Sequence, residues 1–192
     1  MLLKLPILLS LTSSAIWAVI PFRQYGKKYF YYFYFITLGN LLILYLRWLF
    51  HSGSNFFYVP GNFLALVFVQ DVSLIKKYKF GLLIILAILS LLYFKIDTNE
   101  TFILLSIIQS MILLTLLKLL IKTLINRQVI DLFLSVMILD VIITILVQLG
   151  IIHGATNNYY YFYVSVTFDS LVSLFFWIKA DNPILLIKLS TN

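Results

Sequence analysis

The stretch VIDLFLSVMILDVIITILVQLGII, residues 129–152, is long enough to cross a membrane and carries an acid, Asp140, at its middle. A helix needs about 20 apolar residues to cross about 30 Å of hydrocarbon. Lipid offers no water to backbone polar groups, so the stretch is predicted to be a helix. A charge at its centre costs about 2.5–3.5 kcal/mol on insertion scales, so Asp140 is expected to face other helices rather than lipid.

Six further apolar stretches cover most of the remaining chain, separated by polar connections of only a few residues. The seven predicted spans are, in order, Leu5–Phe22, Tyr29–Phe50, Phe56–Leu74, Leu82–Ile96, Thr101–Ile121, Val129–Ile152 and Tyr159–Ala180. The sequence therefore predicts an all-α membrane protein with seven transmembrane helices. We expect one domain over residues 1–192 and no β-sheet.

The composition excludes several classes of protein. The chain is 62% hydrophobic and 11% charged, whereas about a quarter of the residues of a soluble domain are charged. The net charge of +7 does not indicate nucleic-acid binding, because the basic residues lie in short loops that orient helices and meet anionic lipid. The lipid bilayer is thus the expected partner. The chain has no cysteine, which excludes disulfides and thiolate ligands, and no cofactor is predicted.

Basic residues fall on alternate loops. Eleven of the 14 lie at the ends of the first, third, fifth and seventh predicted spans or in the segments that follow them, and only Lys4, Arg47 and Lys95 lie at the opposite side. By the positive-inside rule the N-terminus is outside and the C-terminus is cytoplasmic, in a multi-pass protein of the cell membrane. Tyrosines at the inner end of the second span are expected to anchor it at the membrane interface, namely Tyr29, Tyr31, Tyr32 and Tyr34.

Polar residues recur on the predicted helices at the spacing of one helix face. Asp140, Thr144 and Gln148 follow one another at intervals of four residues, and so do Ser165, Asp169 and Ser173. Shorter polar stripes occupy four other spans: Ser10, Ser13, Ser14 and Trp17; Thr37 and Asn40, with Arg47 further out; Asn62 and Gln70; and Ser106, Gln109 and Ser110. The span 82–96 offers only Ser90, so it is expected to lie at the periphery, against lipid.

Acids at mid-membrane depth commonly mark the path of an ion, a proton or a solute. We therefore predict one site for a solute or ion, with neither catalytic residues nor metal ligands, formed by Asn40, Asn62, Gln109, Asp140, Thr144, Gln148, Ser165, Asp169 and Ser173. The alternative is that these groups only hold helices together, through hydrogen bonds worth about 0.6–2 kcal/mol each. A pair of aspartates could also serve hydrolysis within the membrane, but no nucleophile or metal motif accompanies them.

The polar-poor span 82–96 separates two triplets that both begin outside. A single inverting helix lets residues 5–74 and 101–180 run parallel as two repeat units, an arrangement known from transporters. Asn40 then corresponds to Asp140, and Asn62 to Asp169.

Several short motifs lie in residues 13–79, namely AIWAVIPFR at 15–23, Gly39-Asn40, RWLF at 47–50, VPGN at 59–62 and Gln70. With these motifs, the 3+1+3 plan resembles the SWEET and PQ-loop family of small-solute transporters. The resemblance implies that Asn62 faces the solute. The chain departs from the family pattern at Phe22, which replaces a glutamine, at Gly61, which separates Pro60 from Asn62, and at Asp169, which replaces a second asparagine.

The leading prediction is an integral membrane carrier that moves a small polar or cationic solute, alone or with a proton, through a polar site at the membrane midplane. Pro21 and Pro60-Gly61 would be its flexible points. The alternative is a seven-helix membrane subunit or sensor that transports nothing and binds partner membrane proteins or further copies of itself.

Overall fold

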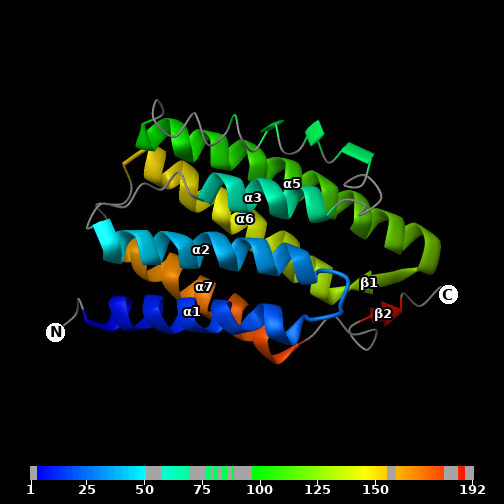
Figure 1. Ribbon diagram of the computed structural model, residues 1–192. Helices are drawn as coiled ribbons and strands as arrows, with labels where there is room; N and C mark the ends of the chain where they lie inside the picture. Colours follow the sequence, from blue (N-terminus) through cyan, green and yellow to red (C-terminus); the bar gives the residue numbers. More distant parts are fainter. Residues whose placement is uncertain are drawn as a thin grey trace.

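The computed structural model describes residues 4–50, 58–69, 77–78, 80–81, 84–85, 88, 97–154, 159–179 and 186–188. These residues form six helices and two short strands: α1 (Lys4–Arg23), α2 (Phe30–Phe50), α3 (Tyr58–Val69), α5 (Thr98–Arg127), β1 (Val129–Asp131), α6 (Leu132–Ile152), α7 (Tyr159–Ile178) and β2 (Leu186–Lys188). The helices run along one long axis, with the two termini at opposite ends (Figure 1). The helical class is confirmed for this part of the chain.

The described residues contain six helices, not the seven expected. The predicted span Leu82–Ile96 lies largely outside them, as does the end of the predicted span Phe56–Leu74, of which α3 covers Tyr58–Val69. Within the fourth span, Ile84, Ile85 and Ile88 are described, and all three are exposed, as expected for a peripheral segment.

Two helices, α5 and α6, are long and apolar enough to cross a membrane by length and composition, and shorter apolar helical segments cover Phe30–Leu42, Tyr58–Val69 and Tyr163–Ile178. This supports membrane association of the helical bundle.

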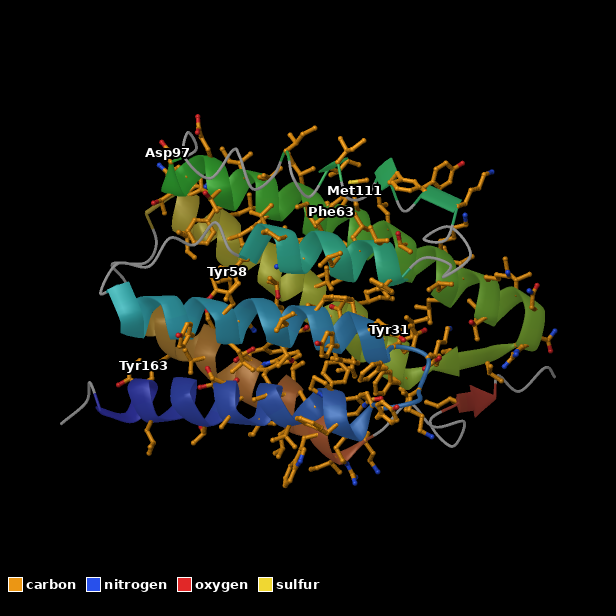
Figure 2. The ribbon with its side chains drawn as sticks, viewed as in Figure 1. Tyr31, Tyr58, Phe63, Asp97, Met111 and Tyr163 are labelled. Carbon is orange, nitrogen blue, oxygen red and sulfur yellow. The ribbon has the colours of Figure 1, made fainter. Side chains whose placement is uncertain are left out.

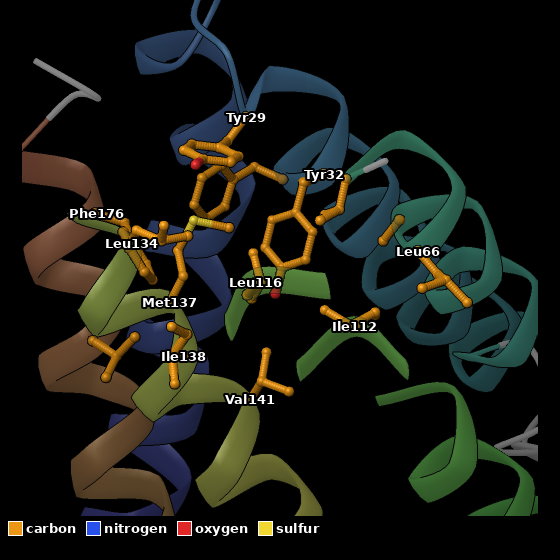
Figure 3. Packing of buried hydrophobic residues seen from close by; sticks show 14 of the residues in the cluster. Tyr29, Tyr32, Leu66, Ile112, Leu116, Leu134, Met137, Ile138, Val141 and Phe176 are labelled. Atoms are coloured by element: carbon orange, nitrogen blue, oxygen red, sulfur yellow. The ribbon is translucent and has the colours of Figure 1, made fainter. Parts of the chain in front are cut away.

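Each described helix packs against its neighbour in chain order, and α1 packs against α7, so that the bundle closes on itself. The core lies inside this ring. Its fully buried members come from all six described helices and include Ile20, Phe33, Val59, Ile112, Phe133 and Phe176. Figure 3 shows this packing around Tyr32, whose ring reaches from α2 into the interior near Leu116 and Val141.

Helix α5 is longer at both ends than the predicted span Thr101–Ile121. Asp97 caps its start, because the Asp97 side chain accepts from the Glu100 backbone N–H and the Glu100 side chain accepts from the Asp97 N–H. The helix then runs for 30 residues to Arg127. At 1.5 Å per residue this is about 45 Å, so α5 is longer than the hydrocarbon layer is thick.

The expectation of no β-sheet was wrong. β1 and β2 pair antiparallel, with Val129 opposite Lys188 and Asp131 opposite Leu186. Gln128 ends α5 in the left-handed conformation with φ 51°, and the Asp131 side chain caps α6 by accepting from Leu134 N–H at 3.0 Å. The residues between are extended, so α6 begins at Leu132 and not at Val129, and their backbone groups pair with the C-terminal segment (Figure 1).

The tyrosines of α2 do not form one interfacial group. Tyr31 and Tyr34 are exposed, as expected, but Tyr29 and Tyr32 are 3% and 2% exposed and belong to the core. Tyr29 stacks on Phe133 of α6 with ring centroids 5.9 Å apart. Because a helix turns every 3.6 residues, consecutive tyrosines point in different directions, and only part of such a run can face lipid.

Candidate functional site

Asp169 lies where α7 contacts α1, and two α1 side chains bind its carboxylate. Trp17 Nε1 donates to Asp169 Oδ1 at 3.0 Å, and the Ser13 hydroxyl donates to Asp169 Oδ2. Ser13 and Trp17 are four residues apart, so both project from one face of α1. Both are buried. Each carboxylate oxygen thus receives one hydrogen bond from an uncharged donor.

A proline and a threonine hold Trp17 in this position. Pro21 lies within α1, and its ring nitrogen has no hydrogen to donate to the carbonyl four residues earlier, which is that of Trp17. The buried Thr37 hydroxyl of α2 donates to this carbonyl at 2.9 Å. The Trp17 ring also packs against Phe33 and Phe176, with centroids 6.3 and 6.1 Å away. Trp17 therefore contacts both α2, through its carbonyl, and α7, through its ring nitrogen.

Asp140 on α6 belongs to the same region. It is half-buried, and its carboxylate interacts electrostatically with Asp169 and with the buried Tyr32 of α2. We call Ser13, Trp17, Tyr32, Asp140 and Asp169 the acid cluster. Within the residues that the structure describes, no lysine or arginine pairs with either carboxylate. Two acids that interact electrostatically thus have only uncharged side chains named around them among the described residues, an arrangement that favours a cation or a proton.

A second group of polar side chains joins α3, α5 and α6. Gln109 Nε2 donates to Asn62 Oδ1, and Asn62 Nδ2 donates to the Tyr58 carbonyl at 2.8 Å. The Ser106 hydroxyl lies 3.0 Å from Gln148 Oε1 and 2.8 Å from the Phe102 carbonyl. We call Asn62, Ser106, Gln109 and Gln148 the amide cluster. All four are buried, and none is charged.

Close approach of α2 and α3 positions Asn62. A Cβ atom at Gly61 would lie 3.0 Å from the Phe35 carbonyl oxygen and 3.2 Å from Gly39 Cα. Pro60 is in the first turn of α3, where backbone N–H groups have no helical acceptor, so that the missing N–H of proline costs no hydrogen bond. Gly61 therefore lies at a tight crossing of α2 and α3 at the start of α3.

The nine predicted site residues divide between these clusters and four positions outside them. Asp140 and Asp169 lie in one cluster, and Asn62, Gln109 and Gln148 in the other. Asn40 and Ser165 are half-buried, Thr144 donates to the carbonyl of Asp140 on its own helix at 2.9 Å, and Ser173 donates to that of Ser170 at 2.9 Å. The side chain of Arg47 lies outside the described residues.

Sequence reasoning did not assign Ser13, Trp17, Tyr32 and Ser106 to the site. Ser13, Trp17 and Ser106 belong to polar stripes at helical spacing, and that spacing was the available signal. Tyr32 carries no such signal, because it sits in a run of tyrosines of which only some point inward.

No protein-family model, curated protein or solved structure matches this chain.

Proposed function

We propose that this protein is a multi-pass carrier of the cell membrane that moves a small cationic solute, alone or in exchange with a proton, past the acid cluster. The observation that carries the proposal is the surroundings of Asp169. Its carboxylate is held between α1 and α7 by the neutral donors Ser13 and Trp17, and a second carboxylate, Asp140, interacts with it.

The charge balance supports a cationic solute in particular. A buried carboxylate is strongly unfavourable unless it is paired or neutralised. Ser13 and Trp17 orient Asp169 but bring no positive charge, and the described part of the chain supplies no basic partner. A solute ammonium or a proton would supply it. The wider class of small polar solutes remains part of the proposal, because the amide cluster lies on the same face of α6.

The distribution of basic residues supports the transmembrane arrangement of the carrier. Arg23 at the end of α1 donates to the Trp177 carbonyl at the end of α7, at 3.1 Å. Tyr29, directly after the basic loop of Lys27 and Lys28, stacks on the start of α6. The described basic loops therefore gather at one end of the bundle, which would be cytoplasmic under the positive-inside rule. The proposal includes a seventh spanning helix at 82–96.

Transport would require α1 and α7 to separate and reclose around Asp169. Side chains of α1 and of Gln24, which follows it, contact α7 and its end at two levels. Asp169 forms the inner contact, and at the helix end Arg23 and Gln24 donate to the last carbonyls of α7. The bend that Pro21 permits in α1 lies between these levels.

The test uses full-length protein in lipid vesicles on a solid-supported membrane, with methylammonium as the probe. We expect a transient current on addition of methylammonium in the wild type, and its loss in Asp169→Asn and Asp140→Asn. Asp97→Asn is the matched control, because Asp97 is an exposed acid at a helix start and asparagine caps equally well. Because exchange of one cation for one proton moves no net charge, the internal pH of the vesicles is recorded as well. If wild-type vesicles gave neither a current nor a change in internal pH with guanidinium, the carrier proposal would be wrong.

The second candidate is a membrane subunit or sensor that transports nothing. The observation in its favour is that both oxygens of Asp169 are already hydrogen-bonded, as in a purely structural contact between helices. In this case Asp169→Asn would leave ion fluxes unchanged. It would instead weaken assembly, measured as loss of a copurifying membrane protein or of self-association in detergent.

A further inference from the structure

The amide cluster contains a buried oxygen without a partner. Gln109 is 5% exposed, and its Oε1 is the buried side-chain atom of the described residues that accepts no hydrogen bond. Buried polar atoms are nearly always paired, so an unpaired one in a polar site indicates a missing donor. The atom belongs to a group of four polar residues on three helices and is not an isolated side chain.

The identity of this oxygen does not depend on which way the amides are turned. The backbone carbonyl of Tyr58 only accepts, so the Asn62 atom facing it must be the nitrogen. Asn62 Oδ1 then faces Gln109, so Gln109 must present its nitrogen there. Gln109 Oε1 therefore points away from Asn62. One backbone carbonyl thus sets the orientation of both amides, and turning either amide over would bring two oxygens or two N–H groups together.

A second acceptor in the cluster is also short of donors. The Ser106 hydroxyl has one hydrogen but two acceptors within reach, the Phe102 carbonyl and Gln148 Oε1. It can satisfy only one at a time. Gln109 Oε1 and, when Ser106 donates to the Phe102 carbonyl, Gln148 Oε1 are therefore amide oxygens that can accept from a further donor. A ligand with a hydrogen-bond donor would meet only uncharged side chains at these four residues.

We propose that the amide cluster is a second binding site, separate from the acid cluster, for a small uncharged molecule whose hydroxyl or amide N–H donates to Gln109 Oε1. Gln148 and Asp140 are eight residues apart on α6, or about 12 Å along the helix, so the two clusters lie at different levels of the bundle. An uncharged ligand suits the amide cluster, because a cation there would lack the carboxylates that stand two turns away.

The amide cluster lies toward the end of the bundle at which Tyr58, Asp97 and Tyr163 are found (Figure 2). Asn62 is one turn from the start of α3, and Gln148 is one turn from the end of α6. Along α5, Ser106 and Gln109 lie 8 and 11 residues after Thr98, or about 12–17 Å from the start of that helix. A ligand that entered from there would reach the amide cluster before the acid cluster.

The experiment measures the melting temperature of the purified full-length protein in detergent against increasing glycerol, acetamide or methylammonium. A ligand that binds the native state raises the Tm in a saturable way. We expect saturable shifts with glycerol or acetamide in the wild type, and an apparent affinity about tenfold weaker in Gln109→Met, which keeps the side-chain length but removes the amide. Ser110→Ala is the matched control on the exposed side of α5 and should behave as wild type.

Three further results make the test decisive. The methylammonium shift should persist in Gln109→Met and disappear in Asp169→Asn, and its loss in Gln109→Met would show one site where we propose two. If the neutral probes act equally on the wild type and Gln109→Met, Gln109 Oε1 is satisfied by a fixed water, and the proposal is wrong. Should Gln109→Met fail to fold, Gln109→Glu in its protonated form retains both a donor to Asn62 and a free acceptor, and it must keep the neutral-probe shifts.

Discussion

The acid cluster and the amide cluster lie in the same bundle but differ in how many of their buried acceptor oxygens receive a hydrogen bond. Each oxygen of Asp169 has a donor from α1, whereas Gln109 Oε1 has none among the described residues. An unpartnered buried charge costs far more than an unpartnered amide oxygen. The comparison teaches that the buried Asp169 carboxylate is held by donors from the protein, whereas a buried amide oxygen can be left without a donor at moderate cost.

The largest effect should come from removing the centre of the acid cluster. Trp17→Ala deletes a buried ring that packs against Phe33 and Phe176 and also the donor to Asp169. We expect a loss of about 3–5 kcal/mol in the free energy of unfolding, as for other buried aromatic truncations. Unfolding by denaturant in mixed micelles measures it.

Trp17→Phe separates the two contributions. It keeps most of the ring and loses only the N–H group, so its cost should be about 1–2 kcal/mol. If Trp17→Phe were as damaging as Trp17→Ala, the hydrogen bond and not the packing would dominate the acid cluster.

Two buried serines sharpen the difference between contacts across helices and contacts within one. Ser13 and Ser173 are both almost fully buried, but Ser13 donates to a carboxylate on another helix and Ser173 to a carbonyl of its own helix. Ser13→Ala should cost about 1–2 kcal/mol and Ser173→Ala about 0.5 kcal/mol or less. Equal costs in the same unfolding measurement would mean that Ser173 also acts beyond its own helix.

The amide cluster depends in turn on how closely α2 and α3 approach each other. A methyl group at Gly61 would press on the backbone of Phe35 and Gly39, so Gly61→Ala should destabilise by about 1–3 kcal/mol. It should also weaken the neutral-probe shifts, because Asn62 follows directly. Gly81→Ala is the control, since a Cβ there would have nothing within 4 Å. An unchanged melting temperature in Gly61→Ala would show that the crossing can relax.

Apolar run length was enough to predict where most helices lie, because spanning segments need little beyond about 20 apolar residues. It did not predict their ends. The start of α5 follows from the cap at Asp97 and the start of α6 from Asp131, and both are side-chain hydrogen bonds that hydropathy does not register. The pairing of β1 with β2 joins segments more than 50 residues apart and has no local signal.

For the site, helical spacing predicts Asp140 and Gln148 on one face of α6, yet it could not say which helices each residue meets. The contact of Asp169 with Ser13 and Trp17 depends on α1 packing against α7, at a separation of more than 150 residues. The same spacing grouped Thr144 and Ser173 with the site, although their hydroxyls bond within their own helices. Polar periodicity identifies a face but not whether a hydroxyl is already used locally.

The most specific effect concerns Thr37 and Pro21, which lie at the Trp17 carbonyl in the acid cluster. Thr37→Val keeps the shape but leaves the Trp17 carbonyl without its donor, at a cost of about 1 kcal/mol. In a Pro21→Ala background the new N–H at position 21 can reach the same carbonyl, so Thr37→Val should then cost almost nothing. A double-mutant cycle of unfolding free energies should give a coupling of about 1 kcal/mol. Additive costs would show that Thr37 does not substitute for the hydrogen bond that Pro21 cannot make, and that the Trp17 position is set by ring packing alone.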